Sequence, residues 1–560
     1  MKGFPAATSF AVVIFGFAVA QYQTNSAQNL LQKVINTLNS YSVSKPGPGS
    51  AAGIFAQGCR WRVAPRRKTA AGPFQGFWDV RHYEYWNEST QKWSSEQPDA
   101  CRIQPLLFKS SLSRNNKDND TPSTKRRCVR DEYCVFKNLW YNGGKFYYLT
   151  DDKDGMDSIP MTRDITLYPL VIHNVSLFPS QVNSRIVPDS TVLIDFLYFI
   201  HPTAIGHWLE HLMPLVSAIR EEQEQKQERL QQQPTMSFPP DRILLLHLKR
   251  THLIEWVRAV LAAAINTNTG SNKNDNNRNS KDVGKINNEL PPMYLQKEVN
   301  SLWDQIGTTL EGIEDSEWIC FQNVLVVKDT FSGGGRVVKT PPDAENFRNK
   351  AYEMHEMPSP PPVQARKEGK WSPKITVFHK STNRRIVNEA ALLRMLRQFS
   401  GGSIRVVEFT FDTPFKDQLE IMASTDILVS THTSALANLA FLPRGAVVLE
   451  LIHKNWVWSN LDTSFKAQSD ARGDLYHWAW RAVKKEHGKY INPRDEQRFG
   501  GDEWAGDKCD TDDCVEAHTN IDVIVDIEAV EKLLVERLPL IQESKQSNNR
   551  TAVNFPWPPP

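Results

Sequence analysis

DILVSTHTSALANLAFLPRGAVVLELI, from Asp426 to Ile452, is the most informative segment of the chain. The apolar run Ile427–Val429 is typical of a buried strand, and polar residues then crowd a turn around His432. A short apolar helix is predicted over Ala435–Phe441, and a second buried strand over Ala446–Ile452. Together they form a half-Rossmann unit, which binds ligands at the carboxyl ends of its strands. Backbone N–H groups and hydroxyls at such a turn suit a phosphate-bearing donor.

Length and charge narrow the class of protein. The chain has 560 residues, enough for two or more domains with a large core. Its 66 basic and 64 acidic residues give a net charge of +2, which offers no electrostatic case for a nucleic-acid-binding protein. The 16 Trp and 34 Pro residues indicate a compact, aromatic-rich enzyme with long irregular connections.

The N-terminus and the cysteines indicate the secretory pathway. An apolar run over Phe4–Ala20 ends in small residues, so residues 1–20 are either a cleaved signal peptide or a short signal anchor. We therefore expect a lumenal protein of the Golgi or endoplasmic reticulum, either secreted or single-pass type II. Seven cysteines suit an oxidising compartment, and Cys128–Cys134 and Cys509–Cys514 are spaced as local disulfides. Four sequons fit lumenal surface loops: Asn87, Asn119, Asn174 and Asn549.

The chain divides into two α/β halves. After a polar stem over residues 21–57, an N-terminal α/β domain is predicted over 58–356, with a disordered insertion at 266–288. Its expected strands are Thr191–Leu197, Arg242–Leu248 and Asn323–Val327, and its expected helices are Gly206–Arg220 and Leu253–Ile265. The Gln- and Glu-rich segment Glu221–Gln233 is interpreted as the solvated end of the first helix.

A Pro-rich linker over residues 357–373 leads to a second, Rossmann-like domain over 374–545 and a tail over 546–560. Its expected strands are Ile375–Phe378, Ile404–Phe409, Ile427–Ser430 and Ala446–Ile452. Asn388 and Thr413 are expected to cap two of its helices, and Asp526–Leu538 reads as a late amphipathic helix. Two such halves imply a ligand cleft between them.

Basic residues lie where a helix is expected to begin. Arg384 and Arg385 precede the Asn388 cap, beside Lys380 at the end of a strand, so they suit a diphosphate clamp or, alternatively, a solvated basic turn. His432 is either a donor to phosphate or sugar or a structural hydrogen-bonding residue. Glu450 is either an acceptor from ribose hydroxyls or part of an ion pair at the domain surface.

The segment Lys374–Ile452 resembles the catalytic region of glycosyltransferase family 61. The motif of that family is matched, in order, by Lys380, Arg384, Arg385, Asn388, Gln418, His432, Asn438, Phe441, Pro443, Gly445 and Glu450. The first-domain motif of the family, a His followed by an apolar pair, an acidic residue and a Pro, reads here as Gly206-His207-Trp208-Leu209-Glu210-His211-Leu212-Met213-Pro214.

Two positions depart from the family pattern. Thr433-Ser434-Ala435 replaces the Gly-Ala-Gly after the turn His, so backbone cannot approach a phosphate as closely, although hydroxyls are able to replace lost N–H contacts. The acidic position four residues after His207 is occupied by His211, while Glu210 lies about 100° round the helix from it.

The resemblance implies a GT-B fold, with two Rossmann-like domains facing a cleft: an acceptor-side domain over 58–356 and a nucleotide-sugar-binding domain over 374–545. It also implies an inverting enzyme. It implies transfer of a pentose or N-acetylglucosamine from a UDP-sugar to a glycan or glycoprotein acceptor. His207 is the first candidate for the general base or its hydrogen-bonding partner, followed by Glu210, with His211 beside them. The residues expected to bind the nucleotide sugar are Lys380, Arg384, Arg385, Asn388, His432, Thr433, Ser434, Asn438 and Glu450. Neither a metal nor another cofactor is implied, and a membrane is contacted only through the N-terminal segment.

Other readings stay open. His207–His211 also matches the H-x-x-E-H signature of zinc peptidases, and the altered His432 turn is compatible with a catalytically inactive binding protein on the same scaffold. Asp152-Lys153-Asp154 imitates an acidic metal motif but is interpreted as a solvated turn. Core packing is favoured over sugar stacking for most of a group of aromatic residues: Trp456, Trp458, Tyr476, Trp478 and Trp480.

Overall fold

The computed structural model describes the larger part of the chain. The described residues are 61–63, 83–87, 92–94, 123–129, 133–142, 145–150, 167–171, 182–195, 204–228, 236–266 apart from 237, 247 and 249, 290–295, 317–327, 337–363, 372–401, 404–456, 462–504, 511–546 and 558. The chain splits into two units, Met1–Gln57 and Gly58–Pro560. The predicted signal segment, the stem, nearly all of the predicted insertion and the Asp152-Lys153-Asp154 motif lie outside the described residues.

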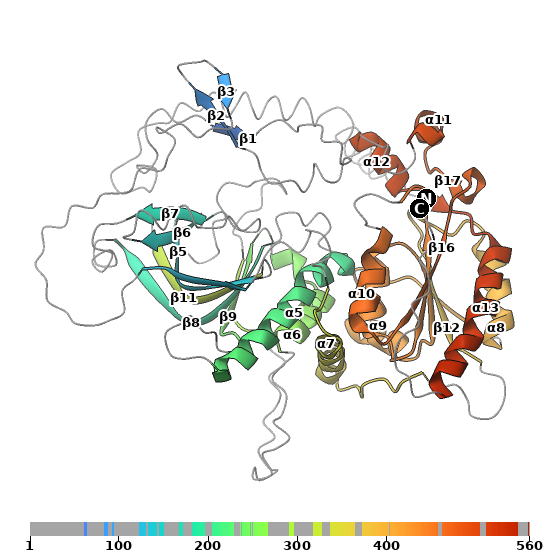
Figure 1. Cartoon of the computed structure of the whole chain (residues 1–560), viewed down its shortest axis with the longest axis horizontal. Helices are drawn as coiled ribbons and strands as arrows, with labels where there is room; N and C mark the ends of the chain where they lie inside the picture. The colour runs from blue at the N-terminus through green and yellow to red at the C-terminus, as the bar shows by residue number, and fades with distance from the viewer. Residues whose placement is uncertain are drawn as a thin grey trace, which may run out of the picture. The chain divides into compact units, whose positions relative to one another are not determined.

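The first half is built on a mixed eight-stranded sheet (Figure 1), in the order β10-β9-β8-β11-β5-β6-β7 with β4 paired to β5. Its core strands β8, β9, β10 and β11 are parallel, whereas β5 is antiparallel to β4, β6 and β11. The strands are β4 (Lys125–Val129), β5 (Tyr133–Asn142), β6 (Lys145–Thr150), β7 (Leu167–Val171), β8 (Ser184–Asp195), β9 (Arg242–Leu246), β10 (Met293–Leu295) and β11 (Trp318–Val327). A separate small sheet contains β1 (Trp61–Val63), β2 (Tyr83–Asn87) and β3 (Lys92–Ser94).

Helices cover one face of this sheet. The helix α5 (Ile205–Glu228) packs on α6 (Glu255–Ile265), and their apolar side chains share a core with alternate residues of β8 and β9. The predicted strands and helices therefore exist, but β8 and β11 begin earlier than expected. The antiparallel strand β5 was not predicted, because it is buried on both faces and shows no alternation.

The prediction that Glu221–Gln233 is the solvated end of the first helix is wrong at Glu222, which lies within α5 and is buried with 2% of its surface exposed. Its carboxylate accepts a hydrogen bond of 2.8 Å from the Tyr133 hydroxyl and pairs with Arg127. A paired carboxylate can be buried because its partners replace the lost water. This contact joins α5 to β4 and β5.

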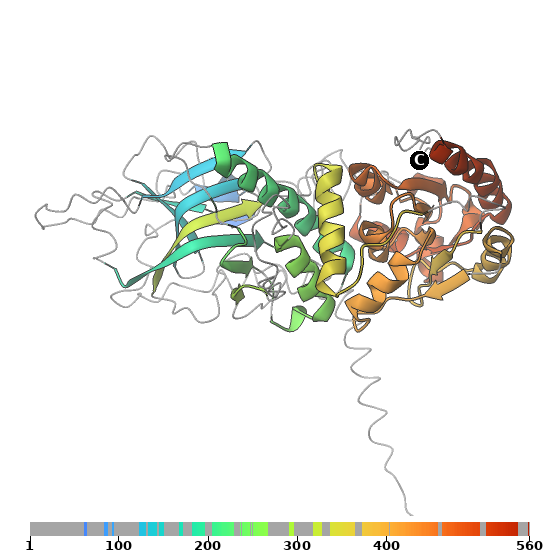
Figure 2. The same cartoon turned by 90° about the horizontal axis from the view of Figure 1, so that it is seen from below.

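The second half is built on a five-stranded, wholly parallel sheet in the order β13-β12-β14-β15-β16. Its strands are β12 (Ile375–Phe378), β13 (Ile404–Val407), β14 (Ile427–Thr431), β15 (Val447–Ile452) and β16 (Tyr476–Arg481). Its helices include α8 (Glu389–Ser400), α9 (Phe415–Ala423), the 3₁₀ helix η6 (Ser434–Phe441), α10 (Ser464–Arg472) and α13 (Ile527–Gln546). α8 and α13 pack side by side on one face of the sheet (Figures 1 and 2), whereas α9, η6 and α10 lie on the other. The α/β class with parallel sheets agrees with the prediction.

Four aromatic residues of the predicted group are described. Trp478 is fully buried, and Trp456 and Trp480 are nearly so, which confirms core packing for these three; Tyr476 is half-buried. Three of the four belong to β16, a strand that was not predicted.

Two helix starts differ in detail from the predictions. Asn388 occupies the N-cap position of α8, but its side chain makes no capping bond. Its amide instead donates to the Val525 carbonyl at 2.7 Å and accepts from the Val525 N–H at 2.9 Å. Pro414, rather than Thr413, is the N-cap of α9, and the Thr413 hydroxyl accepts from the Thr410 N–H instead.

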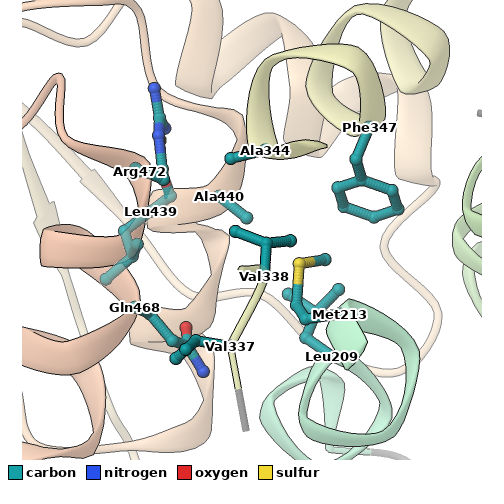
Figure 3. A pocket seen from close by; sticks show the side chains of 10 residues that line it. All are labelled: Leu209, Met213, Val337, Val338, Ala344, Phe347, Leu439, Ala440, Gln468 and Arg472. Atoms are coloured by element: carbon teal, nitrogen blue, oxygen red, sulfur yellow. Dashed lines mark hydrogen bonds between the residues drawn. The ribbon is translucent and has the colours of Figure 1, made fainter. Parts of the chain in front are cut away.

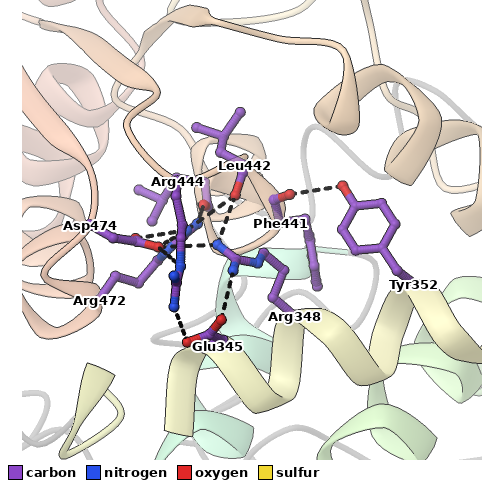
Figure 4. A network of polar contacts seen from close by, with 9 residues as sticks. Glu345, Arg348, Tyr352, Phe441, Leu442, Arg444, Arg472 and Asp474 are labelled. Atoms are coloured by element: carbon purple, nitrogen blue, oxygen red, sulfur yellow. Dashed lines mark hydrogen bonds and ion pairs between the residues drawn. The ribbon is translucent and has the colours of Figure 1, made fainter. Parts of the chain in front are cut away.

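The helix α7 (Pro341–Met354) contacts α5 and α6 as well as η6 and α10. Figure 4 shows how its polar side chains hold the end of η6: Arg348 donates to the Leu442 carbonyl at 3.3 Å and pairs with Asp474 at 3.1 Å. Tyr352 donates to the Phe441 carbonyl at 2.8 Å, and Arg472 donates to the carbonyls of Leu439 and Leu442. These donors satisfy carbonyls that a helix end leaves unpaired.

The predicted domain boundaries stay a prediction. In the described part of the predicted linker, the Val363 N–H donates to the Arg444 carbonyl at 2.8 Å, so this segment is packed on the second half. None of the described helices is both long and apolar enough to span a bilayer.

Replacing Arg348 by Ala is expected to lower the free energy of unfolding by about 2–3 kcal/mol, because the change removes a buried charged donor to the Leu442 carbonyl and an ion pair with Asp474, and leaves both acceptors to Arg472. Urea denaturation measures the change. Lys532→Ala, which removes an exposed ion pair with Glu536, is the control and should stay within about 0.5 kcal/mol of wild type. Equal stability of the two variants would contradict this role of Arg348.

Candidate functional site

The centre of the candidate site is a buried carboxylate held by two imidazoles. Glu450 in β15 is fully buried; its Oε1 pairs with His432 Nδ1, and its Oε2 lies 2.8 Å from His477 Nε2. Burial alone would raise the pKa of the Glu450 carboxyl, but His432 and then His477 outweigh burial and lower it to about 2. Glu450 is therefore a charged partner of two histidines.

This geometry changes the interpretation of Glu450. Because both carboxylate oxygens are engaged and no part of the residue is exposed, Glu450 does not present an acceptor to a ribose. Nor does it form the ion pair at the domain surface that was the other reading. It fixes the ring of His432, the residue that follows β14.

Arg384 joins the loop after β12 to this turn. Its Nη1 donates to the His432 carbonyl at 2.9 Å, and its guanidinium lies 5.7 Å from the centre of the Trp456 ring. The backbone of Arg384 is left-handed, with φ of 53°, a conformation that is rare outside glycine. Burial lowers its pKa to about 10, so it stays cationic at neutral pH.

Arg384 has unused binding capacity. Its buried Nε has no hydrogen-bond partner, and within the described residues no carboxylate pairs with its guanidinium. A buried cation without a counter-ion is costly. The arrangement suits an anionic ligand.

Lys380 supplies a second positive charge in the same loop. Its Nζ donates to Asn383 Oδ1 at 2.7 Å. Burial, and then the charge of Arg384, lower the pKa of Lys380 to about 8, against the opposing effect of Glu408. The electrostatic influence of Arg384 on this amine indicates that the two cations are close.

The other predicted residues of the clamp are placed differently. Arg385 is exposed and forms an ion pair of 2.6 Å with Asp522, and Asn388 is bound to Val525. Of the paired arginines, Arg384 is thus the one that reaches the His432 turn. The structure brings together Lys380, Arg384 and His432, but commits Arg385 and Asn388 to the segment that precedes α13.

The residues after His432 form the start of η6. Thr433 is its buried N-cap and makes no side-chain capping bond, while Ser434 is half-buried. Asn438 is fully buried: its amide donates to the Ala435 carbonyl at 3.0 Å, and its Oδ1 has no partner. A buried acceptor of this kind is a candidate for binding a ligand hydroxyl.

The first-domain motif lies against the same turn. A Cβ added to Gly206 would lie 3.1 Å from Ser434 Cα, closer than most Cβ contacts, so glycine favours the close approach of α5 to η6. The next residue, His207, is partly exposed, and its Nδ1 lies 3.8 Å from Glu210 Oε2. His211 lies one turn further along α5 and is half-buried.

Within the described residues, no three His, Cys, Asp or Glu side chains are grouped as a metal site would require. The zinc-peptidase reading therefore lacks a third protein ligand in that part of the chain.

Three aromatic side chains surround His432, an arrangement that the sequence did not predict. The ring centroid of His432 lies 4.8 Å from Phe465, 5.5 Å from Trp456 and 6.3 Å from His453. Burial, and then Arg384 and His432, lower the pKa of His453 well below its ordinary value. Its position directly after β15, at a carboxyl strand end, was a signal that could have identified it, whereas His477 belongs to the unpredicted strand β16.

An apolar cavity lies beside the site rather than in it. Figure 3 shows side chains from α5, α7, η6 and α10 around a space of about 10 Å³, roughly that of one water molecule. Its lining residues are Leu209, Met213, Val337, Val338, Ala344, Phe347, Leu439, Ala440, Gln468 and Arg472. The space is far too small for a nucleotide sugar.

Cysteine pairing agrees with the predictions where it is described. Cys128 and Cys134 form a disulfide, and Cys514 is disulfide-bonded, although Cys509 lies outside the described residues. Cys320 is free and buried.

Comparison with known proteins shows similarity to one family of glycosyltransferases. Residues 205–449 match the model of the family described as Glycosyltransferase 61. The matched region begins at the first residue of α5 and ends one residue before Glu450, so it contains the first-domain motif and all of the second motif except Glu450. The match confirms the predicted family resemblance and supports the prediction of a glycosyltransferase enzyme.

Individual relatives are similar over shorter segments. Protein O-linked-mannose beta-1,4-N-acetylglucosaminyltransferase 2 of Xenopus laevis is 36% identical over 115 residues, which are 20% of this chain and 19% of the relative. The Homo sapiens protein of the same name is 36% identical over 114 residues, with the same coverage. EGF domain-specific O-linked N-acetylglucosamine transferase of Rattus norvegicus is 38% identical over 87 residues, 15% of this chain and 16% of the relative. The chain thus aligns with about a fifth or less of the length of these relatives.

Proposed function

We propose that this chain is an inverting glycosyltransferase that transfers a sugar from a UDP-sugar to a glycan or glycoprotein. One observation carries the proposal: the partly buried guanidinium of Arg384, whose Nε has no partner, is bonded to the carbonyl of His432, in the region that matches the family. Arg384 and Lys380 together supply positive charge where the parallel strands end, which is the usual ligand position in such sheets.

In this proposal the cations stabilise the leaving diphosphate. Arg384 offers a buried donor without a partner, and Lys380 offers a second charge in the same loop. Donors preorganised in a site of low dielectric stabilise developing negative charge strongly. The chemistry proposed here requires no metal and no cofactor beyond the donor co-substrate.

His207 is proposed as the base that removes the proton from the acceptor hydroxyl. It is partly exposed, unlike His432 and His453, and it follows the glycine that packs on Ser434. The Glu210 carboxylate, 3.8 Å away, would stabilise the imidazolium that forms. Attack by the activated hydroxyl opposite the diphosphate would invert the anomeric centre.

The names of the relatives describe transfer of N-acetylglucosamine to protein-linked acceptors, so UDP-N-acetylglucosamine is the first donor to test, ahead of a UDP-pentose. A lumenal location in the Golgi or endoplasmic reticulum is part of the proposal. The Cys128–Cys134 disulfide supports it, because such bonds persist in oxidising compartments.

The first prediction concerns donor binding. A thermal-shift screen with UDP-, GDP- and CMP-sugars should show stabilisation by the UDP compounds, worth about 2.7 kcal/mol at a ligand concentration of one hundred times Kd. Arg384→Ala should abolish this shift because it removes the buried charge. Arg405→Ala, an exposed arginine on β13, is the matched control and should keep it. A UDP-sugar thermal shift that is unchanged in the Arg384 variant would contradict the proposed donor site.

The second prediction separates chemistry from binding. His207→Ala should lower kcat by about a hundredfold or more, the usual contribution of a general base, while the Kd for UDP stays near that of wild type. Single-turnover transfer from UDP-N-acetylglucosamine to glycoprotein acceptors measures the first quantity, and calorimetry measures the second. If wild type binds UDP-sugars and transfers none of them, the chain is a binding protein.

The third prediction follows from the pKa of Lys380. The amine is charged below about pH 8 and loses its proton as pH rises through that value, so UDP should bind more weakly at pH 9 than at pH 7. The phosphate charge itself is nearly constant above pH 7. We expect Kd to rise by up to about tenfold over this range, and Lys380→Arg to flatten the profile because arginine stays charged. A wild-type Kd that does not vary with pH would contradict this role for Lys380.

A further inference from the structure

The loop after β12, which contains Lys380 and Arg384, is bound along its length by a segment that lies far from it in the sequence. The donor loop comprises residues 380–388, between β12 and α8, and its partner is the segment 520–525, which contains the short strand β18 (Asp522–Val523). Both are described throughout, and 137 residues separate the paired positions. We propose that Asp522 is a positioning residue that holds Arg384 in its binding conformation; this inference rests on the proposed function.

Asp522 makes three hydrogen bonds to one residue of the donor loop. Its Oδ1 accepts from the backbone N–H of Arg385 at 2.8 Å, and its Oδ2 accepts from Arg385 Nε at 2.9 Å and Nη2 at 2.6 Å. Asp522 is fully buried, whereas the Arg385 side chain is 45% exposed. The carboxylate therefore fixes the main chain as well as the side chain of Arg385.

Backbone pairing extends the contact on both sides. The Val523 N–H donates to the Arg385 carbonyl at 2.8 Å, and the Val387 N–H donates to the Val523 carbonyl at 2.8 Å. Asn383 Nδ2 donates to Asn520 Oδ1 at 2.6 Å, upstream of Arg384. Arg384 thus lies between two anchored residues.

This anchoring explains the conformation of Arg384. A left-handed backbone costs an arginine free energy, and such a conformation persists only when the surrounding structure determines it. The loop could relax if Asp522 were removed, and the guanidinium would then leave the His432 carbonyl. Asp522 has no contact with the proposed reacting atoms and acts through Arg385 on Arg384.

The region that carries Asp522 also supports the other side of Arg384. Asn455 Nδ2 lies 3.2 Å from His518 Nε2, and the next residue, Trp456, faces the guanidinium of Arg384. The segment from His518 to Val525 is therefore in contact with both loops that flank Arg384. Because one segment contacts both loops, it holds them in a fixed position relative to each other.

The test is a double-mutant cycle on the full chain, with UDP and uridine as probes and calorimetry as the measurement. Asp522→Ala should raise the Kd for UDP about tenfold and leave the Kd for uridine within about twofold, because the diphosphate contact alone is weakened. In the Arg384→Ala background, the same change should have no further effect. If Asp522 had only a structural role, Asp522→Ala would weaken the binding of UDP and of uridine alike, and its effect would add to that of Arg384→Ala.

Controls keep the outcomes distinct. Asp513→Ala, which breaks an exposed ion pair with Arg498 near the same segment, should leave both Kd values unchanged. Asp522→Asn keeps an acceptor for the Arg385 N–H and should give an intermediate Kd for UDP; it also carries the cycle if the alanine variant does not unfold cooperatively. Loss of UDP affinity in Arg384→Ala but not in the Asp522 variants overturns this inference alone. Absence of UDP binding by wild type overturns the proposed function and this inference with it.

Discussion

The buried carboxylate of Glu450 is the constraint on which the rest of the site depends. A charged group that is buried away from solvent must be paired, and here the imidazoles of His432 and His477 are the partners of the Glu450 carboxylate. Parallel pairing of β14 with β15 and of β15 with β16 brings His432 and His477 to either side of it. The position of the His432 ring, and with it the carbonyl that Arg384 binds, follows from this electrostatic requirement. The strand pairing of the sheet therefore also determines the geometry of the candidate site.

The turn after β14 is also held from outside the sheet. Donors from α7 and α10 bind the carbonyls at the end of η6, while the backbone of α5 lies against its start at Gly206. Both ends of an eight-residue element are thus fixed by other helices. Such support leaves little freedom to the residues that face a ligand, and preorganisation of that kind is what electrostatic stabilisation of a leaving group requires.

The sequence allowed the strands of the second half to be predicted because parallel strands buried on both faces form continuous apolar runs, as in Ile427–Val429. The same reasoning missed β16, whose sequence YHWAWR mixes aromatic and charged residues. Partners that are distant in sequence leave no periodic signal: the roles of Asn388 and Arg385 are determined by Val525 and Asp522. The motif residues were thus identifiable, but which of two adjacent arginines reaches the turn was not.

The contact between Gly206 and Ser434 has a consequence for exchange between relatives. The backbone of one half approaches that of the other so closely at Gly206 that an added Cβ would lie 3.1 Å from Ser434 Cα, which is tighter than most Cβ contacts. The two halves are therefore not interchangeable modules. A chimaera that joins the first half of this chain to the second half of a relative would bring together two surfaces that are not fitted to each other. To change donor preference by such an exchange, α5 should be transferred together with the turn that it contacts.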